Sequence, residues 1–328
     1  GCVGSTTTAS NMKHPMSRGT RSLIALIYVR NDTLAKYMIS IIRLFFLAVA
    51  TFLGGLLITF VSPLKLFSPT EKLSYQLAAG IAGVWADFMR WLLTTVKTEY
   101  VITGDKLDPK GTYLILANHQ SWIDIMMVMV VLGKGTTLPR FFMKWELVYM
   151  PVINICAWAL DFPIMRRYTQ EDIKDRPELK NRDFDYAHEV LSRNPDQACV
   201  VVNYAEGTRF TPEKHKKNRS PYKHLLKPKV GGPQLALNCL RNRLDGIIDI
   251  TLAYPGAKLG VWQLLAGQVP KVMIHVETIE LPEGLEKTPE TLAELKAFRS
   301  WMNSIWVKKD ARIEQMINGT QASDHTSL

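Results

Sequence analysis

The sequence predicts an α/β protein in which a mainly parallel β-sheet is flanked by helices and preceded by an N-terminal membrane-embedded helical hairpin. From about residue 98 onward, short apolar runs alternate with longer amphipathic ones, as strands and helices do in a parallel sheet covered on both faces. Before that point lie two long apolar stretches, residues 44–61 and 73–96, and the first carries no charge. The chain of 328 residues is long enough to bury a large core.

The N-terminal part is expected to form a flexible basic leader over residues 1–36 and a membrane-associated helical hairpin over residues 37–97. The first apolar stretch is just long enough to span a bilayer. The second carries Asp87 and Arg90, three positions apart on one helical face. Basic residues lie on both sides of the pair and fix no orientation. The pattern therefore favours a hairpin within one leaflet over a spanning helix with an interfacial one, or two buried helices of a soluble domain.

The remainder is expected to form one domain over residues 98–290, followed by a C-terminal amphipathic helix and tail over residues 291–328. The expected strands are residues 112–118, 198–207, 246–254 and 271–281, and the expected helices are residues 122–132, 184–193 and 232–242. Ligands of such sheets collect beyond the carboxyl ends of the strands, so polar residues that follow a strand are the first candidates for a site.

Charge and cysteine usage narrow the class of protein. The formal net charge of +10 suits nucleic acid, an anionic lipid surface or a phosphorylated substrate as a partner. The four cysteines are far apart and include no C-x-x-C pair. The sequence therefore suggests neither a zinc site nor a disulfide framework, which fits a reducing compartment.

The first candidate site is "ANHQSWID", which continues the strand expected at residues 112–118. His119 and Asp124 then lie at the carboxyl edge of the sheet, with Asp124 near the start of the next helix. A turn between them lets the carboxylate accept a hydrogen bond from one imidazole nitrogen, which leaves the other as a base. Ser121 is poorly placed as a nucleophile, so the substrate would supply its own hydroxyl. The alternative is a structural histidine followed by a helix-capping aspartate.

The second candidate site is "VVVNYAEGTRF", where another expected strand runs into polar residues. Glu206 and Arg209 bracket Gly207 and Thr208, whose small size lets a ligand approach the backbone. Arg209 offers a planar fork of donors that suits a phosphate or a carboxylate. The alternative is an ion pair between Glu206 and Arg209 that only shapes the loop.

Together the two stretches resemble the signature of the glycerolipid acyltransferase family, the lysophosphatidate acyltransferases and their relatives. That signature pairs an N-H-x4-D block with E-G-T-R, and Asn118, His119, Asp124 and residues 206–209 match it. Two further stretches are similar to other blocks of the family, "KWELVYMPVINICAWALDFPIMRR" and "ITLAYPG". Two more, "YKHLLKPK" and "WMNSIWVKKD", are similar to the branch that includes lysocardiolipin and lysophosphatidate acyltransferases and bacterial members. The resemblance extends over residues 40–316.

The resemblance implies the glycerolipid acyltransferase fold and a mechanism. His119 would take a proton from a lipid hydroxyl that attacks an acyl thioester, and Asp124 would orient the imidazole. The implied substrate-binding residues are Glu206, Gly207, Thr208, Arg209, Lys144, Arg166 and Arg167. The resemblance implies no metal or bound cofactor, because acyl-CoA or acyl-carrier protein enters as a co-substrate.

The implied reaction is acylation of 1-acyl-glycerol-3-phosphate to phosphatidic acid. The expected partners are a lysophospholipid acceptor, an acyl thioester donor and an anionic membrane surface. Because acyl thioesters are cytosolic, the protein is expected on the cytoplasmic face of a membrane, which is the inner membrane in a bacterium. One alternative is a lysocardiolipin-like remodelling acyltransferase, and another is a non-catalytic lipid- or nucleic-acid-binding protein. Residues 213–224, "EKHKKNRSPYKH", are basic, but no nucleic-acid motif surrounds them, so no nucleic acid is expected.

Overall fold

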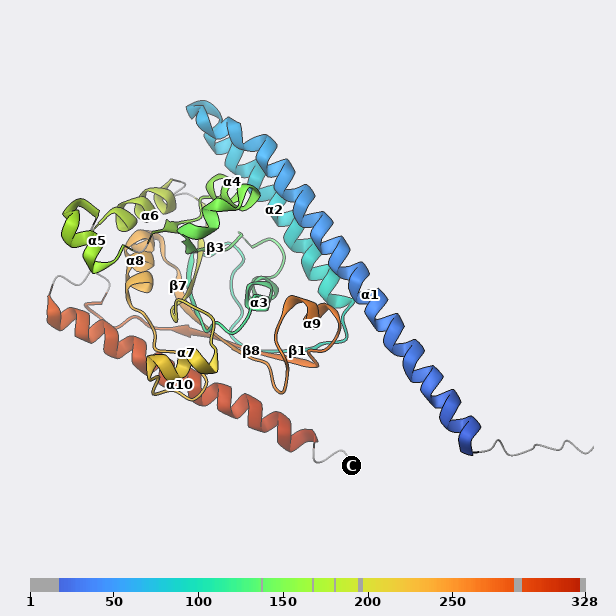
Figure 1. Ribbon diagram of the computed structural model, residues 1–328. Coiled ribbons are helices and arrows are strands. Elements are labelled where there is room, and N and C mark those ends of the chain that lie inside the picture. The colour runs from blue at the N-terminus through green and yellow to red at the C-terminus, as the bar shows by residue number, and fades with distance from the viewer. Residues whose placement is uncertain are drawn as a thin grey trace, which may run out of the picture.

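The computed structural model describes residues 18–136, 138–166, 168–179, 181–193, 197–285 and 291–324, with the side chains of the first helix described from Leu34 onward. A helical hairpin lies along one side of an α/β domain, and a long C-terminal helix lies along another side (Figure 1). The mainly parallel sheet flanked by helices confirms the fold class that the sequence predicts.

The hairpin consists of α1 (Arg18–Val61) and α2 (Glu71–Thr94), joined by two 3-10 turns that each contain a proline. Both helices contain the apolar stretches from which they are predicted. However, α1 is helical from Arg18 onward, whereas the sequence predicts a flexible leader through residue 36. The rest of that predicted leader, residues 1–17, lies outside the described residues.

The two hairpin helices pack closely in antiparallel directions. Ala78, Ala82 and Ala86 of α2 recur at every fourth position on one face and are buried, which lets the helix backbones approach. Trp85 Nε1 donates to Thr51 Oγ1 of α1 at 3.0 Å, across the hairpin.

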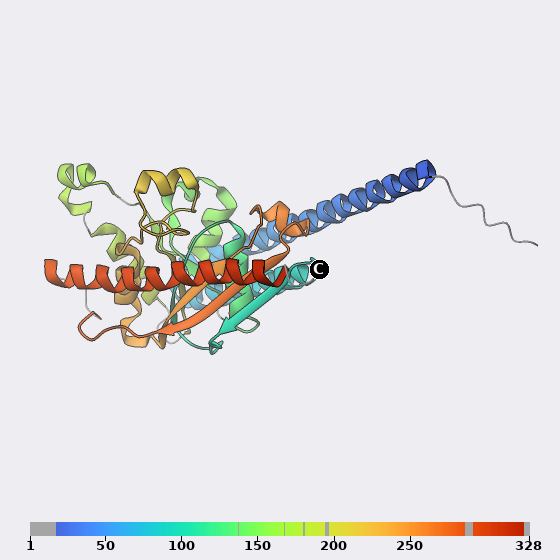
Figure 2. The same cartoon turned by 90° about the horizontal axis from the view of Figure 1, so that it is seen from below.

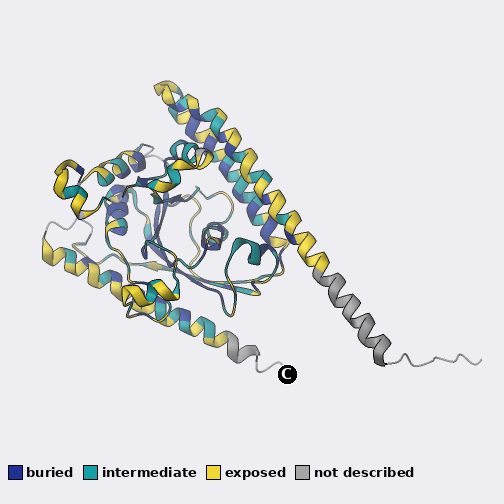
Figure 3. Ribbon diagram, viewed as in Figure 1, coloured by how far each residue is buried: buried dark blue, intermediate teal, exposed yellow. Residues whose placement is uncertain are grey.

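The outer face of α1 is apolar and exposed. Leu34–Leu66 is long and apolar enough to cross a membrane, with a mean hydropathy of 2.5 over its most apolar window, and 17% of that window is buried. Large apolar side chains face outward along it, including Met38 (63% exposed), Phe45 (61%) and Phe60 (75%). Figure 3 shows this exposed face along the length of the hairpin. A helix that packs on a soluble domain normally presents polar residues on its outer side.

Within the described residues, six strands form one sheet in the order β1-β8-β7-β2-β6-β3. Neighbouring strands run parallel except β7 and β8, which are antiparallel. The strands of this sheet are β1 (Glu99–Gly104), β2 (Tyr113–Ala117), β3 (Arg140–Phe141), β6 (Val200–Tyr204), β7 (Gly246–Ala253) and β8 (Lys271–Ile279). A second sheet pairs β4 (Met143–Lys144) with β5 (Ile164–Met165).

All four strands that the sequence predicts are present, as β2, β6, β7 and β8. The antiparallel pairing of β7 with β8 departs from a repeated strand-helix-strand pattern. A parallel neighbour needs a crossover built on a helix, whereas the connection over residues 254–270 holds only the short α9 (Val261–Leu265). The chain therefore turns back beside β7 instead of crossing the sheet.

Helices cover both faces of the sheet. Along β2, Ile115 packs in one buried cluster with Met89 and Met127 of the helices on one face, and Leu116 packs in a second cluster with Leu237 and Trp306 on the other. Three of the helices, α3 (Ile123–Leu132), α6 (Arg182–Ser192) and α8 (Gly231–Leu240), confirm the helices predicted from the sequence. Besides α1, α2 and α9, the helices are α3 (Ile123–Leu132), α4 (Pro151–Ala159), α5 (Gln170–Asp175), α6 (Arg182–Ser192), α7 (Pro212–Asn218), α8 (Gly231–Leu240) and α10 (Leu292–Asp324).

The C-terminal helix α10 lies across the sheet (Figure 2) and buries a lysine against it. Lys309 is 0% exposed, and its Nζ donates to the carbonyls of Ile250 at 2.6 Å and Leu116 at 3.3 Å. Asp249 Oδ1 lies 2.7 Å from the same nitrogen. Burial lowers the pKa of Lys309, and the charge of Asp249 opposes that change. The predicted amphipathic helix is thus fixed to the middle of the sheet.

Candidate active site

Three neighbouring parallel strands, β2, β6 and β7, end at one edge of the sheet, and the polar residues that follow them meet there. His119 follows β2, Glu206 follows β6 and Tyr254 follows β7. This is the edge at which the sequence predicts a site, because carboxyl ends of parallel strands share one side of a sheet.

The structure brings His119 and Asp124 together, as the sequence predicts. His119 Nδ1 lies 2.8 Å from Asp124 Oδ2, with the histidine side chain 16% exposed and the aspartate side chain fully buried. A neutral imidazole that donates from Nδ1 carries a lone pair on Nε2. The pair is therefore arranged as a base whose tautomer is fixed by a buried carboxylate.

Asp124 is held by hydrogen bonds to both of its oxygens. Oδ2 also accepts the backbone N–H groups of Gln120 at 2.6 Å and Ser121 at 2.8 Å, and Oδ1 accepts the hydroxyl of Tyr254 at 2.6 Å. Its place in the first turn of α3 adds the favourable end of the helix dipole. These contacts compensate for burying the carboxylate and prevent it from turning away from the imidazole.

Glu206 is buried and holds the backbone of His119 by a hydrogen bond, and it is not exposed at the surface of the site. It is 2% exposed, and its two oxygens accept the backbone N–H groups of His119 and Leu226, both at 2.8 Å. Burial raises the pKa of Glu206 to about 7, while those two bonds and the charge of Lys309 lower it. Because both oxygens already have backbone partners, we assign Glu206 a positioning role in place of the substrate contact expected from the sequence.

Asn118 holds the loop before the histidine. Its side chain is fully buried, donates to the carbonyl of Leu252 at 2.9 Å and accepts that residue's N–H at 2.8 Å. The carbonyl of His119 accepts the N–H of Phe210 at 2.7 Å. The segment after β2 is thereby linked to β7 and to the segment after β6 by paired polar groups, as buried loops require.

Two tyrosines of the site are missed by the sequence reasoning. The ring of Tyr204 stacks on the ring of His119, with centroids 4.1 Å apart, and Tyr254 binds Asp124. Burial raises the pKa of both tyrosines well above the ordinary value, and the negative charge of Asp124 adds to the effect. Each ends or follows a predicted strand at the same edge as His119, and that position alone is the signal that identifies them.

The other predicted residues of the second motif, Gly207, Thr208 and Arg209, are less buried than Glu206. The guanidinium of Arg209 is exposed and lies 5.1 Å from the ring centre of Trp122, which is 51% exposed. Lys214 Nζ donates to Thr208 Oγ1 at 2.7 Å and to the carbonyl of Arg209 at 3.1 Å. Gly207 has φ +69°, a conformation that favours glycine, and a Cβ there would lie 3.1 Å from the side chain of Lys229. Arg209 and Glu206 form no ion pair among the described contacts.

The predicted residues of the middle block lie on the second, small sheet. Lys144 of β4 is exposed and pairs with Met165 of β5 in the register of that sheet. Arg166 follows β5, and its guanidinium lies 3.8 Å from the ring centre of Trp145. Arg167 lies outside the described residues. Lys144 and Arg166 are thus neighbours at one sheet end, and each remains a candidate for binding an anion.

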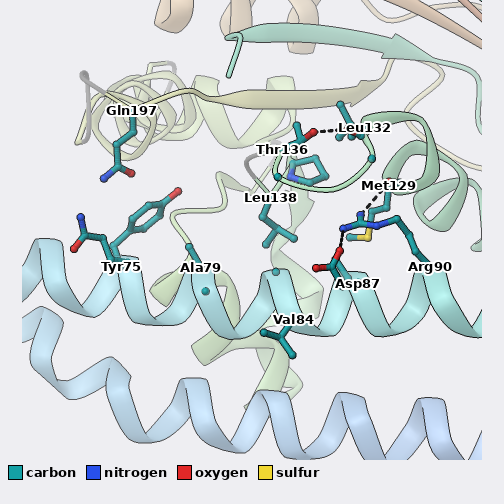
Figure 4. Close-up of a pocket in the computed structure, with 17 residues that line it drawn as sticks. Tyr75, Ala79, Val84, Asp87, Arg90, Met129, Leu132, Thr136, Leu138 and Gln197 are labelled. Carbon is teal, nitrogen blue, oxygen red and sulfur yellow. Dashed lines mark hydrogen bonds and ion pairs between the residues drawn. The ribbon is translucent and has the colours of Figure 1, made fainter. Parts of the chain in front are cut away.

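Among the described residues, no group of three His, Cys, Asp or Glu residues is placed to hold a metal ion. A separate hollow of about 470 Å³ lies between α2 and the segment after α3 (Figure 4). In that hollow Arg90 pairs with Asp87 and donates to the carbonyl of Met129 at 3.2 Å. None of the predicted site residues lines it.

A histidine-aspartate pair at a sheet edge, with an arginine-bearing loop beside it, is an arrangement suited to transfer of an acyl group to a hydroxyl. A model of the Acyltransferase family matches residues 98–254, from the start of the sheet to the end of β7. Residues 98–254 therefore form a domain of this acyltransferase family, which confirms the resemblance seen in the sequence.

Known acyltransferases are similar to the chain over most of its length. Lysocardiolipin acyltransferase 1 of Gallus gallus is 27% identical over 75% of this chain and 65% of its own length. 1-acyl-sn-glycerol-3-phosphate acyltransferase gamma of Homo sapiens is 27% identical over 79% of this chain and 69% of its own length. The chain thus spans about two thirds of the length of these relatives.

A solved structure shares the fold. The crystal structure of the 1-acyl-sn-glycerophosphate (LPA) acyltransferase PlsC from Thermotoga maritima matches 86% of this chain and 98% of that chain, with a TM-score of 0.50 and 16% sequence identity. At this identity the likeness concerns the fold alone.

Proposed function

We propose that this protein moves a fatty acyl group from an acyl thioester to the free hydroxyl of a lysophosphatidate-type lipid, with phosphatidic acid as the product. The observation that carries the proposal is the 2.8 Å contact between His119 Nδ1 and the buried Asp124. The signature residues that surround this contact and the acyltransferases similar to the chain support the choice of reaction.

The chemistry needs one base and no protein nucleophile. His119 Nε2 takes the proton of the lipid hydroxyl as its oxygen attacks the thioester carbonyl, and the positive imidazolium is stabilised by Asp124. When the tetrahedral intermediate collapses, the C–S bond breaks and the imidazolium returns a proton to the leaving sulfur. A positioned base of this kind contributes about a hundredfold to ten-thousandfold in rate.

The acceptor's phosphate is proposed to bind the cations beside the base. Arg209 presents its guanidinium on the ring of Trp122, and Arg166 presents its own on the ring of Trp145. A ring contact fixes the plane of a guanidinium while its edge stays open for a bidentate bond to phosphate. Lys144 adds a third charge at the end of the small sheet.

The site is proposed to work on a membrane surface, with the exposed apolar face of α1 in the lipid and the domain on the cytoplasmic side. Moving an acyl chain from lipid into water costs about 0.8 kcal/mol for each methylene group. A domain attached to the leaflet avoids extracting the acceptor. The donor, acyl-CoA or acyl-carrier protein, then reaches the site from the aqueous side without a bound cofactor. The domain boundaries at residues 97 and 290 are part of this proposal, whereas the boundary predicted at residue 36 falls inside α1.

A lysocardiolipin-like remodelling enzyme is the second candidate, because a lysocardiolipin acyltransferase is among the relatives most similar to the chain. It would have to accept a larger, esterified head group. A nucleic-acid-binding role has less support, because several side chains of the basic run already have partners within the protein. Lys223 Nζ and His224 Nε2 lie 2.8 Å and 2.5 Å from the Glu314 carboxylate, and His215 Nε2 lies 2.6 Å from the carbonyl of Tyr222.

The test is an acylation assay with the purified full chain, a panel of lysolipid acceptors and both donor types. We expect wild-type turnover with lysophosphatidate and a loss of about a thousandfold or more in kcat for His119→Ala. His188→Ala, which removes an exposed histidine from α6, serves as the matched control and should keep wild-type turnover. Near-normal turnover of the His119 variant would contradict the assignment of the base, and preference for lysocardiolipin would favour the second candidate.

A further inference from the structure

A second cationic site lies where the hairpin joins the domain. It is a hollow of about 510 Å³ between α1, the end of α2 and the segment between α9 and β8, and none of the candidate active-site residues lines it. The residues that line it and carry the argument are Lys36, Tyr37, Ser40, Arg43, Thr95 and Lys97. We call the cavity that these residues line the hairpin-base hollow.

Hydrogen bonds from Arg43 hold together the elements that surround the hollow. Its Nε donates to Thr95 Oγ1 at 3.0 Å, its Nη1 donates to the carbonyl of Leu265 at 2.9 Å, and its Nη2 donates to the carbonyl of Thr95. These bonds join α1 to the end of α2 and to the end of α9. A guanidinium has five N–H groups, so one on each Nη nitrogen is left for a further acceptor.

The charge of the hollow is not balanced within the described part of the chain. Its lining includes Lys36, Arg43 and Lys97 but no carboxylate, and no described ion pair involves any of the three. The hollow beside α2 differs, because there Arg90 is paired with Asp87. Three uncompensated cations around one cavity favour an anionic ligand.

Apolar and aromatic side chains continue from the hollow along α1. The ring of Tyr37 stacks on Trp262 with centroids 6.3 Å apart, and Tyr37 is 49% exposed. One and two helical turns further on, Ile41 and Phe45 are 57% and 61% exposed. Tyrosine and tryptophan prefer the level of lipid head groups, and basic residues flank the ends of membrane helices there. The hollow thus lies at the polar end of the exposed apolar face.

We infer that the hairpin-base hollow binds the phosphate of an anionic phospholipid of the bilayer, with the lipid's chains lying along α1. The phosphate accepts hydrogen bonds from Arg43, Lys36 and Lys97, and the acyl chains of the lipid cover Ile41 and Phe45. This lipid is neither acceptor nor product, and it holds the hairpin at a set depth. The inference rests on the proposed membrane placement of α1, but it does not depend on the reaction itself.

Native mass spectrometry of the full chain in a neutral detergent tests the site. Phosphatidylglycerol is the anionic probe, phosphatidylcholine is the zwitterionic comparison, and inorganic phosphate and coenzyme A are tested as competitors. We expect phosphatidylglycerol to bind wild type, and Lys36→Gln/Lys97→Gln to lower its affinity about tenfold or more. Arg43 is left intact because its bonds join the hairpin to the domain.

The matched control is Lys106→Gln/Lys110→Gln, which removes two exposed lysines from the connection between β1 and β2. It should retain wild-type affinity for phosphatidylglycerol. An equal loss in both double variants, no loss in the first, or displacement of the lipid by phosphate or coenzyme A would overturn the inference. Acyl transfer is measured on the same samples; its absence with specific lipid binding intact would contradict the proposed function and leave this inference standing.

Discussion

The loop after β2 and the loop after β6 lie side by side at one sheet edge, yet their charged groups are held in different ways. Where the first loop enters α3, Asp124 is fully buried and accepts two backbone N–H groups, a tyrosine hydroxyl and the imidazole. In the second, the guanidinium of Arg209 is exposed, and its closest described contact is the face of Trp122.

The difference matches the two tasks that we propose. Proton transfer requires a base in a fixed orientation, so its carboxylate is enclosed by directional bonds. Binding a phosphate on a mobile lipid needs a positive charge and a planar group of donors, which a guanidinium supplies. A ring contact holds the plane of the guanidinium and leaves its edge accessible to the phosphate. Changes in the first loop should therefore lower kcat, whereas changes in the second should raise KM.

The largest effect in this comparison is expected for Asp124→Asn. The amide keeps the size of the side chain, but it can present an N–H to His119 Nδ1 and so favour the wrong tautomer. We expect kcat to fall on the order of a thousandfold, with KM for the acceptor within about threefold of wild type. Steady-state assays on both substrates measure it, and a change confined to KM would break the contrast between the two loops.

Glu206→Gln tests whether the buried carboxyl under the histidine is structural. Burial raises its pKa to about 7 from an ordinary 4.5, so the folded protein binds the extra proton more tightly than the unfolded chain does. Its contribution to stability is then most favourable below pH 4.5 and is lost as the pH rises through about 7. The shift corresponds to about 3 kcal/mol across that window.

The glutamine variant cannot titrate, so its stability relative to wild type should improve as the pH rises from about 4.5 to 7. Thermal unfolding in detergent over this range measures the difference between the two proteins. At any pH the variant also lacks one of the two acceptors for the N–H groups of His119 and Leu226, and kcat should fall about tenfold. A pH-independent difference in stability would contradict the raised pKa of Glu206.

Much of this contrast is foreseeable from the sequence, and the reasons for the exceptions are physical. The strands β2 and β6 are buried on both faces, so they appear as continuous apolar runs that end at His119 and Glu206. The edge strand β1 is mostly exposed and mixed in composition, and it gives no such signal. The pairing of His119 with Asp124 is local, over five positions, and a turn accounts for it.

The positioning role of Glu206 requires contacts that are not local. Its partners His119 and Leu226 lie 87 and 20 positions away, and only the paired strands bring them to one carboxylate. Lys309 belongs to a basic stripe in the sequence, and its burial depends on Asp249 in a strand 60 positions earlier. Periodicity within α10 contains no information about that partner.

A smaller effect is expected in the open loop for Arg209→Gln. A hydrogen bond to a charged group contributes about 1.5–3 kcal/mol, so KM for a phosphorylated acceptor should rise about tenfold or more. KM for the thioester and kcat should stay within about threefold of wild type. Lys217→Gln, which removes an exposed charge from α7, is the matched control. A fall in kcat with KM unchanged would place Arg209 with the catalytic pair instead.

The smallest expected effect separates the two tyrosines that touch the pair. Tyr254→Phe removes the hydroxyl that donates to Asp124 Oδ1 at 2.6 Å, whereas Tyr204→Phe removes a buried hydroxyl with no described hydrogen-bond partner. Without the Tyr254 bond the carboxylate is less stabilised and attracts the imidazolium more strongly. The acidic limb of the kcat/KM profile should then move to higher pH, with a fewfold loss of kcat at neutral pH.

Tyr204→Phe keeps the ring that stacks on His119 and should leave that profile unchanged, because removing an unpaired buried hydroxyl is nearly neutral. A pH–rate series on both variants makes the comparison, since each loses one oxygen atom at the same edge of the sheet. Equal shifts in the two profiles would mean that the Tyr204 hydroxyl acts on the pair as strongly as the Tyr254 hydroxyl does, which would contradict the control assigned to the bond between Tyr254 and Asp124. A shift in Tyr254→Phe alone would locate that control in the hydrogen bond from the end of β7.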